Sequence, residues 1–140
     1  MSYIESKTNW TKDDFFNIAD YNRISGNMIA IKELAQELFY GIDLKRYENI
    51  AVSKGYNDDI YASEFNAIES NIWLINNHTY KFTKYEIGTQ KTYRSNGATP
   101  TYEDMNRIEY AIQKIYQTMI AQKDALPRLA VRLGQKGIRV

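Results

Sequence analysis

The chain opens three helices with nearly the same five residues: Asp20-Tyr21-Asn22-Arg23-Ile24, Glu64-Phe65-Asn66-Ala67-Ile68 and Asp104-Met105-Asn106-Arg107-Ile108. Each copy consists of an acid, a large apolar residue, an asparagine, a variable residue and an isoleucine. Further apolar residues follow each isoleucine after four and seven positions, a spacing that places them on one face of a helix. We predict a structural role for the repeated positions Asp20, Asn22, Ile24, Glu64, Asn66, Ile68, Asp104, Asn106 and Ile108.

The first repeat has two candidate helix starts. Thr11 and Asp14 have the spacing of a capping box, in which two side chains satisfy the free amides of a first turn. This pair predicts a short helix over 11–17. The same spacing recurs from Asn17 and predicts a long helix over 18–40.

The other two repeats predict one helix each. Thr101 begins another capping box, and the helix behind it is predicted over 102–124. It should end before Pro127, because proline cannot donate the backbone hydrogen bond that continues a helix. The middle repeat lacks an obvious cap and predicts a shorter helix over 62–76.

Two architectures could use such repeats. The acids of successive copies lie 44 and 40 residues apart, counted from position 20 to 64 and from 64 to 104, and periods of this size occur in helical solenoids. However, residues 42–60 share little sequence with residues 77–100, which indicates that only the helix openings are duplicated. We therefore predict one mainly α domain over 1–140, a small bundle of three principal helices.

Two segments lie outside the predicted helices. Residues 79–94 are rich in threonine and aromatic residues, which predicts a short β-hairpin or an extended arm. Residues 126–140 carry bases but no acid and predict an extended C-terminal tail, either a disordered end or an arm that orders on a partner. The candidate partner contacts in these segments are Tyr80, Phe82, Tyr85, Tyr93, Arg128, Arg132, Lys136 and Arg139.

The composition argues against catalysis. The chain has no cysteine, which rules out disulfides, thiolate metal sites and thiol nucleophiles, and its one histidine, His78, has no second histidine with which to share a metal. The acids cluster at predicted helix starts, where they complement the helix dipole. We therefore predict no enzyme activity, no cofactor and no bound metal.

The net charge and the hydropathy of the chain limit the classes of partner that we expect. The net charge is +1, so only the bases of the tail favour nucleic acid, and we do not expect nucleic acid as the partner. No run approaches the roughly 20 apolar residues of a membrane span, and we expect a protein made in the cytoplasm without membrane contact. Twelve tyrosines favour a surface that binds other proteins, although they also suit the helix edges of an ordinary domain.

The repeated asparagines have two interpretations. Asn22, Asn66 and Asn106 fall in the first turns of their helices, where an amide can bond a neighbouring backbone group or reach the next helix. We predict such a local structural bond. The other interpretation is a ladder of amides that binds a ligand.

One stretch supports a resemblance to known proteins. Residues 93–109 contain an aromatic residue, an Asn-Gly turn, a Thr-Pro pair and the helix opening Asp104-Met105-Asn106-Arg107-Ile108-Glu109. This segment resembles one in tail, baseplate and tail-fibre proteins of phages and prophages of Gram-positive bacteria. The stretch from Trp10 to Ile24 resembles the same segment of these proteins. In such proteins the segment is a helical module near an attachment end rather than a catalytic site.

The resemblance implies a structural virion protein that acts as an adaptor or attachment component of a phage tail or baseplate. Its partners would be other virion structural proteins, in a homo-oligomer or ring within the particle, and its location would be the tail region of the virion. Two alternatives stay open: a head-to-tail connector component, and a small helical DNA-binding or regulatory protein that uses the basic C-terminal tail.

Overall fold

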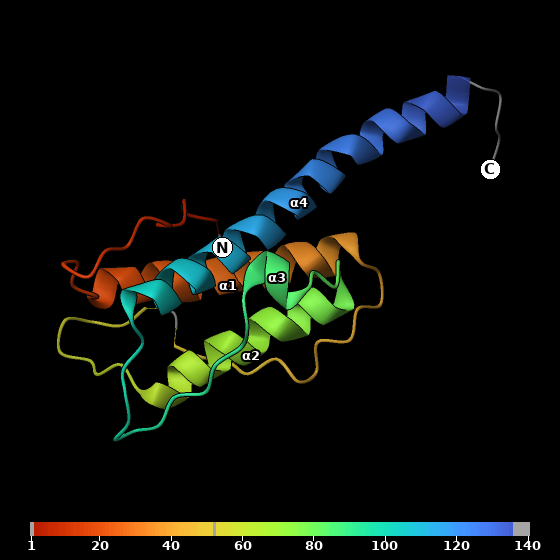
Figure 1. Ribbon diagram of the computed structural model, residues 1–140. Helices are drawn as coiled ribbons and strands as arrows, with labels where there is room; N and C mark the ends of the chain where they lie inside the picture. Colours follow the sequence, from red (N-terminus) through yellow and green to blue (C-terminus); the bar gives the residue numbers. More distant parts are fainter. Residues whose placement is uncertain (1, 52, 136–140) are drawn as a thin grey trace.

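Three long helices make up most of the protein (Figure 1). The computed structural model describes residues 2–51 and 53–135, with side chains up to residue 126. The helices are α1 (Ile18–Leu38), α2 (Ala62–His78), the single turn α3 (Lys84–Ile87) and α4 (Tyr102–Gln135). This arrangement confirms the predicted mainly α bundle of three principal helices.

The three long helices run in the same direction, as the colours of Figure 1 show. Side-chain contacts between α1 and α4 agree with this. Near the helix starts, Arg23 Nε lies 2.8 Å from Glu109 Oε1, and near the end of α1, Lys123 Nζ lies 3.1 Å from Glu37 Oε1. Because the helices are parallel, each connector must run back along the bundle before the next helix begins.

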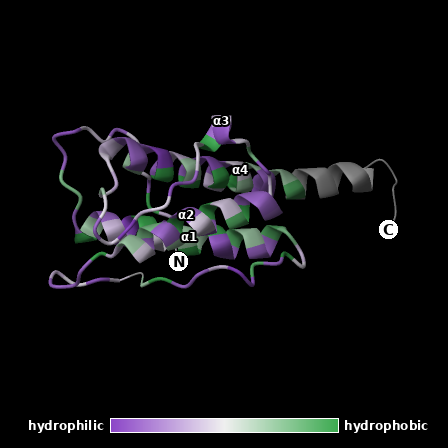
Figure 2. Ribbon diagram, turned by 60° about the horizontal axis from the view of Figure 1, so that its bottom comes forward, coloured by the Kyte–Doolittle hydropathy of each residue, from purple (hydrophilic) through white to green (hydrophobic). Residues whose placement is uncertain are grey.

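The repeated apolar residues form the core between the helices. Ile24, Ile68 and Ile108 are at most 1% exposed, as are most residues four and seven positions further along each helix. Figure 2 shows hydrophobic residues recurring along each long helix among hydrophilic ones, as expected for helices with one buried face. The predicted stripes are therefore the buried faces of α1, α2 and α4.

The predicted helix over 11–17 is wrong. The Thr11 amide donates to Asp14 Oδ2 at 2.9 Å, as in a capping box, but the Asp14 amide donates to the Thr11 carbonyl instead of its hydroxyl, and only one turn follows. Asn17 already caps α1, with its side chain accepting from the Asp20 amide at 3.0 Å. Too few residues remain between the two caps for a helix of its own.

The predicted end of α4 is also wrong, because the helix continues through Pro127 to Gln135. A proline removes one backbone hydrogen bond but does not have to end a helix whose neighbours favour it. Here Ala125, Leu126 and Arg128, all strong helix formers, flank it. The predicted extended tail over 126–140 is thus helical as far as Gln135, and residues 136–140 lie outside the described residues.

Residues 79–94 do not form the predicted hairpin, and the described residues contain no strand. A capping box of Thr83 and Glu86 instead opens α3, and Gly88 ends it with a φ of 86°. Gly88 also lies against the side chain of Arg107 in α4, where any Cβ would collide. Before α3 the segment makes a turn at residues 79–80, and after α3 residues 89–94 have no regular secondary structure, with Tyr93 held by Asn66 of α2.

The burial of the α4 stripe yields a first prediction. Ile108 and Ile112 are fully buried, so replacing either by alanine should lower the free energy of unfolding by about 2–5 kcal/mol through lost burial and a residual cavity. Chemical denaturation measures this directly. Ile4→Ala is the control, because 59% of that side chain is exposed; equal losses at Ile4 and Ile112 would contradict the core assignment.

Candidate interaction site

The repeated asparagines each hold a connector by two hydrogen bonds to one residue. In α1, Asn22 Oδ1 accepts the amide of Lys54 at 2.8 Å, and the Asn22 side-chain amide donates to the Lys54 carbonyl at 3.0 Å. In α2, Asn66 holds Tyr93 in the same way, at 2.6 and 2.8 Å. The carboxamide thus pairs with one peptide residue much as a neighbouring strand would.

The third asparagine completes a cyclic arrangement, in which each long helix holds the segment that precedes another helix. In α4, Asn106 binds the amide and carbonyl of Trp10 at 2.7 and 3.0 Å. Helix α1 therefore holds the connector that leads to α2, α2 holds the connector that leads to α4, and α4 holds the N-terminal segment that leads to α1. The bundle consequently has an internal pseudo-threefold axis parallel to its helices.

A second set of asparagines follows five residues after the first. Asn27 binds both backbone groups of Ile4 at 2.8 and 2.7 Å, and Asn71 binds those of Glu48, both at 2.8 Å. Ile4 and Glu48 each precede the first clamped residue of their connector by six positions. The corresponding residue in α4 is Ala111, which makes no such clamp.

The three connectors share one turn although their sequences differ. A turn begins one residue after each clamped position, closed by hydrogen bonds from Asp14 to Thr11, from Asp58 to Gly55 and from Gly97 to Arg94. The connectors therefore share this turn in structure, although only the helix openings resemble one another in sequence. The asparagine side chains bond backbone groups, but these bonds are not the local ones predicted, because their partners lie 27 to 96 residues away in sequence.

Two of the three helix junctions contain a buried arginine and glutamate. Arg107 of α4 binds both oxygens of Glu69 in α2, and Arg23 of α1 binds both oxygens of Glu109 in α4. Both carboxylates are 1% exposed. The clamped aromatic residue donates to the same glutamate in each case: the Tyr93 hydroxyl to Glu69 at 2.7 Å, and Trp10 Nε1 to Glu109 at 2.5 Å.

The third junction lacks both charges. By position, its arginine is replaced by Ala67 and its glutamate by Ser25, both of them buried. Lys54 and Tyr21 compensate nearby by contacting Glu64 Oε2 at 3.1 and 2.8 Å. The arginine and the glutamate are thus both absent from this junction. This is expected, because either one alone would be a buried, unpaired charge that lowers the stability of the fold.

The motif acids act as helix caps. The carboxylates of Asp20, Glu64 and Asp104 accept the N-cap amide of their own helices. Burial opposes the ionisation of Asp104, but Lys91 and the Thr101 amide outweigh it and hold its pKa below the usual range. Burial also raises the pKa of the Tyr93 hydroxyl, and the Glu69 carboxylate raises it further. Tyr93 therefore stays a neutral donor to Glu69.

The structure places the predicted partner contacts in different environments, some within the bundle and one exposed. Tyr93 is buried in the junction, the Tyr80 hydroxyl donates to Gln122 of α4, and Asn76 holds the backbone of Phe82. These three residues serve the bundle itself. Tyr85 is 88% exposed and can meet a partner. The backbones of Arg128 and Arg132 belong to α4, whereas Lys136 and Arg139 lie outside the described residues.

Other exposed aromatic residues gather at the end of the bundle where the helices begin. This surface, called the start face below, receives at least one from each repeat: Phe15, Tyr56, Tyr61 and Tyr102. Phe15 and Tyr56 are 90% and 94% exposed. A hollow of about 360 Å³ lies between the first and third repeats, beside Phe15 and Tyr102. The start face is therefore the candidate interaction site.

Sequence reasoning missed several of these residues. The sequence predicts no structural role for Asn27, Asn71, Glu69, Glu109 or Trp10, although two signals were present. Asparagine recurs five residues after the motif asparagine in two copies, and glutamate follows three residues after it in two copies. Both recurrences identify positions that bridge two helices or a helix and a connector.

The described residues offer neither a metal site nor a membrane-spanning helix. Among the described residues, no group of three histidine, cysteine, aspartate or glutamate side chains could hold a metal ion. Within the same part of the chain, no helix is both long enough and apolar enough to cross a membrane. Comparisons with models of protein families, with curated proteins and with solved structures found no match.

The clamps lead to a second prediction. Asn66→Ala removes two hydrogen bonds and leaves the Tyr93 amide and carbonyl without partners, so it should lower the free energy of unfolding by about 1–3 kcal/mol. Asn77→Ala is the matched control, because Asn77 lies in the same helix and is exposed. Urea denaturation compares the two; a loss at Asn77 equal to that at Asn66 would contradict a specific clamp.

The junction generates a third prediction. Glu69→Met leaves the Arg107 guanidinium without its carboxylate partner and should lower the free energy of unfolding by about 3–5 kcal/mol. Glu69→Met combined with Arg107→Met should recover most of that loss. A double-mutant cycle by chemical denaturation measures the coupling. Additive losses would show that the two side chains do not act as a pair.

Proposed function

We propose that this chain is a structural component of a phage tail or baseplate, in which it joins neighbouring virion proteins through protein–protein contacts. One observation carries the proposal: each of the three long helices has at least one exposed aromatic residue at or shortly before its start, namely Phe15, Tyr56, Tyr61 and Tyr102. Aromatic residues supply much of the energy of protein interfaces. The resemblance of residues 93–109 to tail and baseplate proteins supplies the setting.

The symmetry favours one kind of neighbour. A homotrimer presents three equal sites around its axis, and each of the three repeats of this chain contributes at least one exposed aromatic residue to the start face. An adaptor with internal threefold repetition can therefore bind a trimeric partner on the start face. Because the repeats differ in sequence, other surfaces of the same chain remain available for a different neighbour.

Purified particles test the proposal. Mass spectrometry should detect the chain in the particle, and crosslinking should join Lys12, which borders the hollow of the start face, to a neighbouring virion protein. Absence from particles, together with salt-sensitive DNA binding that is lost on deletion of residues 126–140, would instead favour the DNA-binding alternative.

Substitutions on the start face provide a fourth prediction. Phe15→Ser combined with Tyr56→Ser should leave the melting temperature unchanged, because both side chains are exposed, and should reduce incorporation into particles about tenfold or more. Tyr40→Ser is the control, since Tyr40 is fully exposed but follows α1 at the opposite end of the bundle. Quantitative mass spectrometry of particles compares the variants; equal incorporation would refute docking by this face.

A further inference from the structure

The turns that follow the three clamped residues are equivalent, but only one of them contains an asparagine followed by a glycine. They span residues 11–14, 55–58 and 94–97, and in each the last residue donates its amide to the carbonyl of the first, at 3.0 or 3.1 Å. The last two residues of the turns are Asp13-Asp14, Asn57-Asp58 and Asn96-Gly97. The third turn therefore differs from the second in the residue that follows a shared asparagine.

The missing side chain at Gly97 removes one hydrogen bond from the third turn. In the other two turns, the carboxylate of the last residue also accepts the amide of the first. Asp14 accepts from Thr11 at 2.9 Å, and the Asp58 carboxylate does the same for Gly55 at 2.6 Å. Gly97 has no side chain that could form this bond. Because the third turn lacks it, this turn opens at a lower cost than the other two.

Asn96 and Gly97 are both accessible to water. Each of the two residues is exposed, and Gly97 lines a hollow of about 310 Å³ together with Arg94 and Tyr93. Glycine has no Cβ, so nothing on residue 97 itself obstructs the approach of the Asn96 side chain to the Gly97 nitrogen. The turn thus combines a side-chain amide, an unhindered backbone nitrogen and free access of water.

We propose that Asn96 is a site of spontaneous deamidation in the folded protein. Once the turn bond from Gly97 to Arg94 opens, the Gly97 nitrogen bonds to Asn96 Cγ and its proton passes through water to the leaving group. The bond between Cγ and Nδ2 breaks, which releases ammonia and leaves a cyclic imide. One water molecule then opens the imide. Opening at Cγ gives aspartate, and opening at the main-chain carbonyl gives isoaspartate.

Either product changes the connector that leads to Tyr102 of the start face. The new carboxylate lowers the net charge of the chain by one from +1. Isoaspartate also lengthens the main chain by one carbon between the clamp at Tyr93 and the cap at Thr101. The first turn already carries an acid at the equivalent position, Asp13, so this turn accepts a carboxylate. The inference does not depend on the proposed assembly role.

Mass spectrometry of the full chain tests the proposal. The native chain and the same chain unfolded in urea are incubated side by side in neutral buffer, and samples are digested over time. The peptide that contains residue 96 should gain about 1 Da in the native chain and separate into two products of equal mass, aspartate and isoaspartate. The native reaction should be slower than the unfolded one by about tenfold at most, which corresponds to about 1.4 kcal/mol, the scale of one net hydrogen bond. A slower native reaction, or no mass gain, would overturn the proposal.

Two variants test the role of the glycine. Gly97→Ala should slow the reaction about tenfold or more, because the added Cβ obstructs the attack. Alanine fits there with a small shift of Arg94, since the φ of Gly97 is not positive and the nearest atom to an added Cβ lies 3.3 Å away. Asn57 is the internal control and should stay intact, whereas Asp58→Gly should transfer the reaction to it. Equal rates at residue 96 with glycine or alanine at position 97, or no reaction at Asn57 in Asp58→Gly, would contradict the mechanism.

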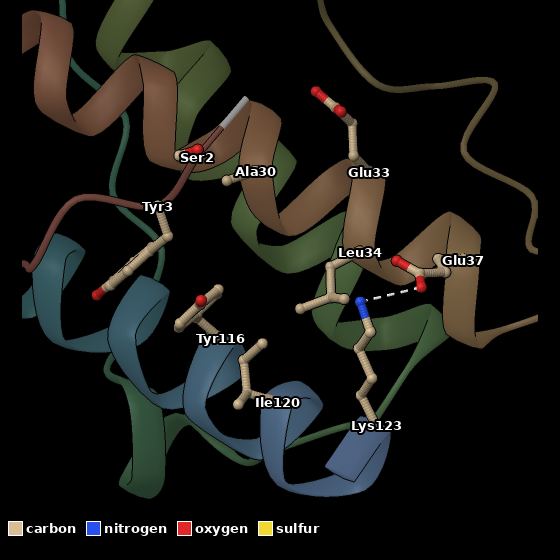
Figure 3. Close-up of a pocket in the computed structure, with 9 residues that line it drawn as sticks. All are labelled: Ser2, Tyr3, Ala30, Glu33, Leu34, Glu37, Tyr116, Ile120 and Lys123. Atoms are coloured by element: carbon tan, nitrogen blue, oxygen red, sulfur yellow. Dashed lines mark ion pairs between the residues drawn. The ribbon is translucent and has the colours of Figure 1, made fainter. Parts of the chain in front are cut away.

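The aromatic stack between the N-terminal segment and α4 reports whether the incubated chain stays folded. Tyr3 and Tyr116 stack with ring centres 3.8 Å apart, beside the groove between α1 and α4 that Figure 3 shows. Fixed aromatic packing gives a near-ultraviolet circular dichroism signal that is lost when tertiary packing is lost. This signal should persist while residue 96 gains mass. A mass gain that begins only after the signal has disappeared would assign the reaction to the unfolded chain and refute the proposal.

Discussion

The two-bond clamp between an asparagine side chain and a connector backbone is the interaction on which this structure depends. Parallel helices require long connectors, and such connectors leave many backbone groups without partners unless something satisfies them. The described part of the protein contains no strand that could do so. Asparagine solves the problem from within a helix, because its side-chain oxygen and nitrogen together match the donor and acceptor of one residue.

The clamps also explain how the core and the junctions fit together. The two connectors between helices are each tied to the helix that precedes them, and the N-terminal segment is tied to α4. Two of these three segments, the N-terminal one and the first connector, are also tied to the helix they lead into. At two of the three junctions, the residue held by the first clamp also donates from its side chain to a buried glutamate, which in turn binds an arginine of another helix. Tyr93, Glu69 and Arg107 form one such series across three segments. Backbone position and charge pairing are therefore coupled.

Much of the fold can be predicted from the sequence because its signals are periodic. The apolar stripes behind Ile24, Ile68 and Ile108 identify the buried faces, and the acids identify the helix starts. The connectors could not be predicted in the same way. An asparagine clamp contacts only backbone atoms, so the clamped residues Trp10 and Lys54 need not resemble each other. Connectors with the same clamp and turn therefore share no recognisable sequence. The parallel direction of the helices, which depends on these connectors, could not be predicted either.

Amide hydrogen exchange tests the clamps most directly. The amides of Trp10, Lys54 and Tyr93 lie in connectors without regular secondary structure, and each donates to an asparagine oxygen. They should exchange slowly, like amides inside the long helices, while exposed connector residues such as Tyr56 exchange rapidly. Rapid exchange at all three clamped amides, in a chain whose helices remain protected, would contradict the central role of the asparagine clamps.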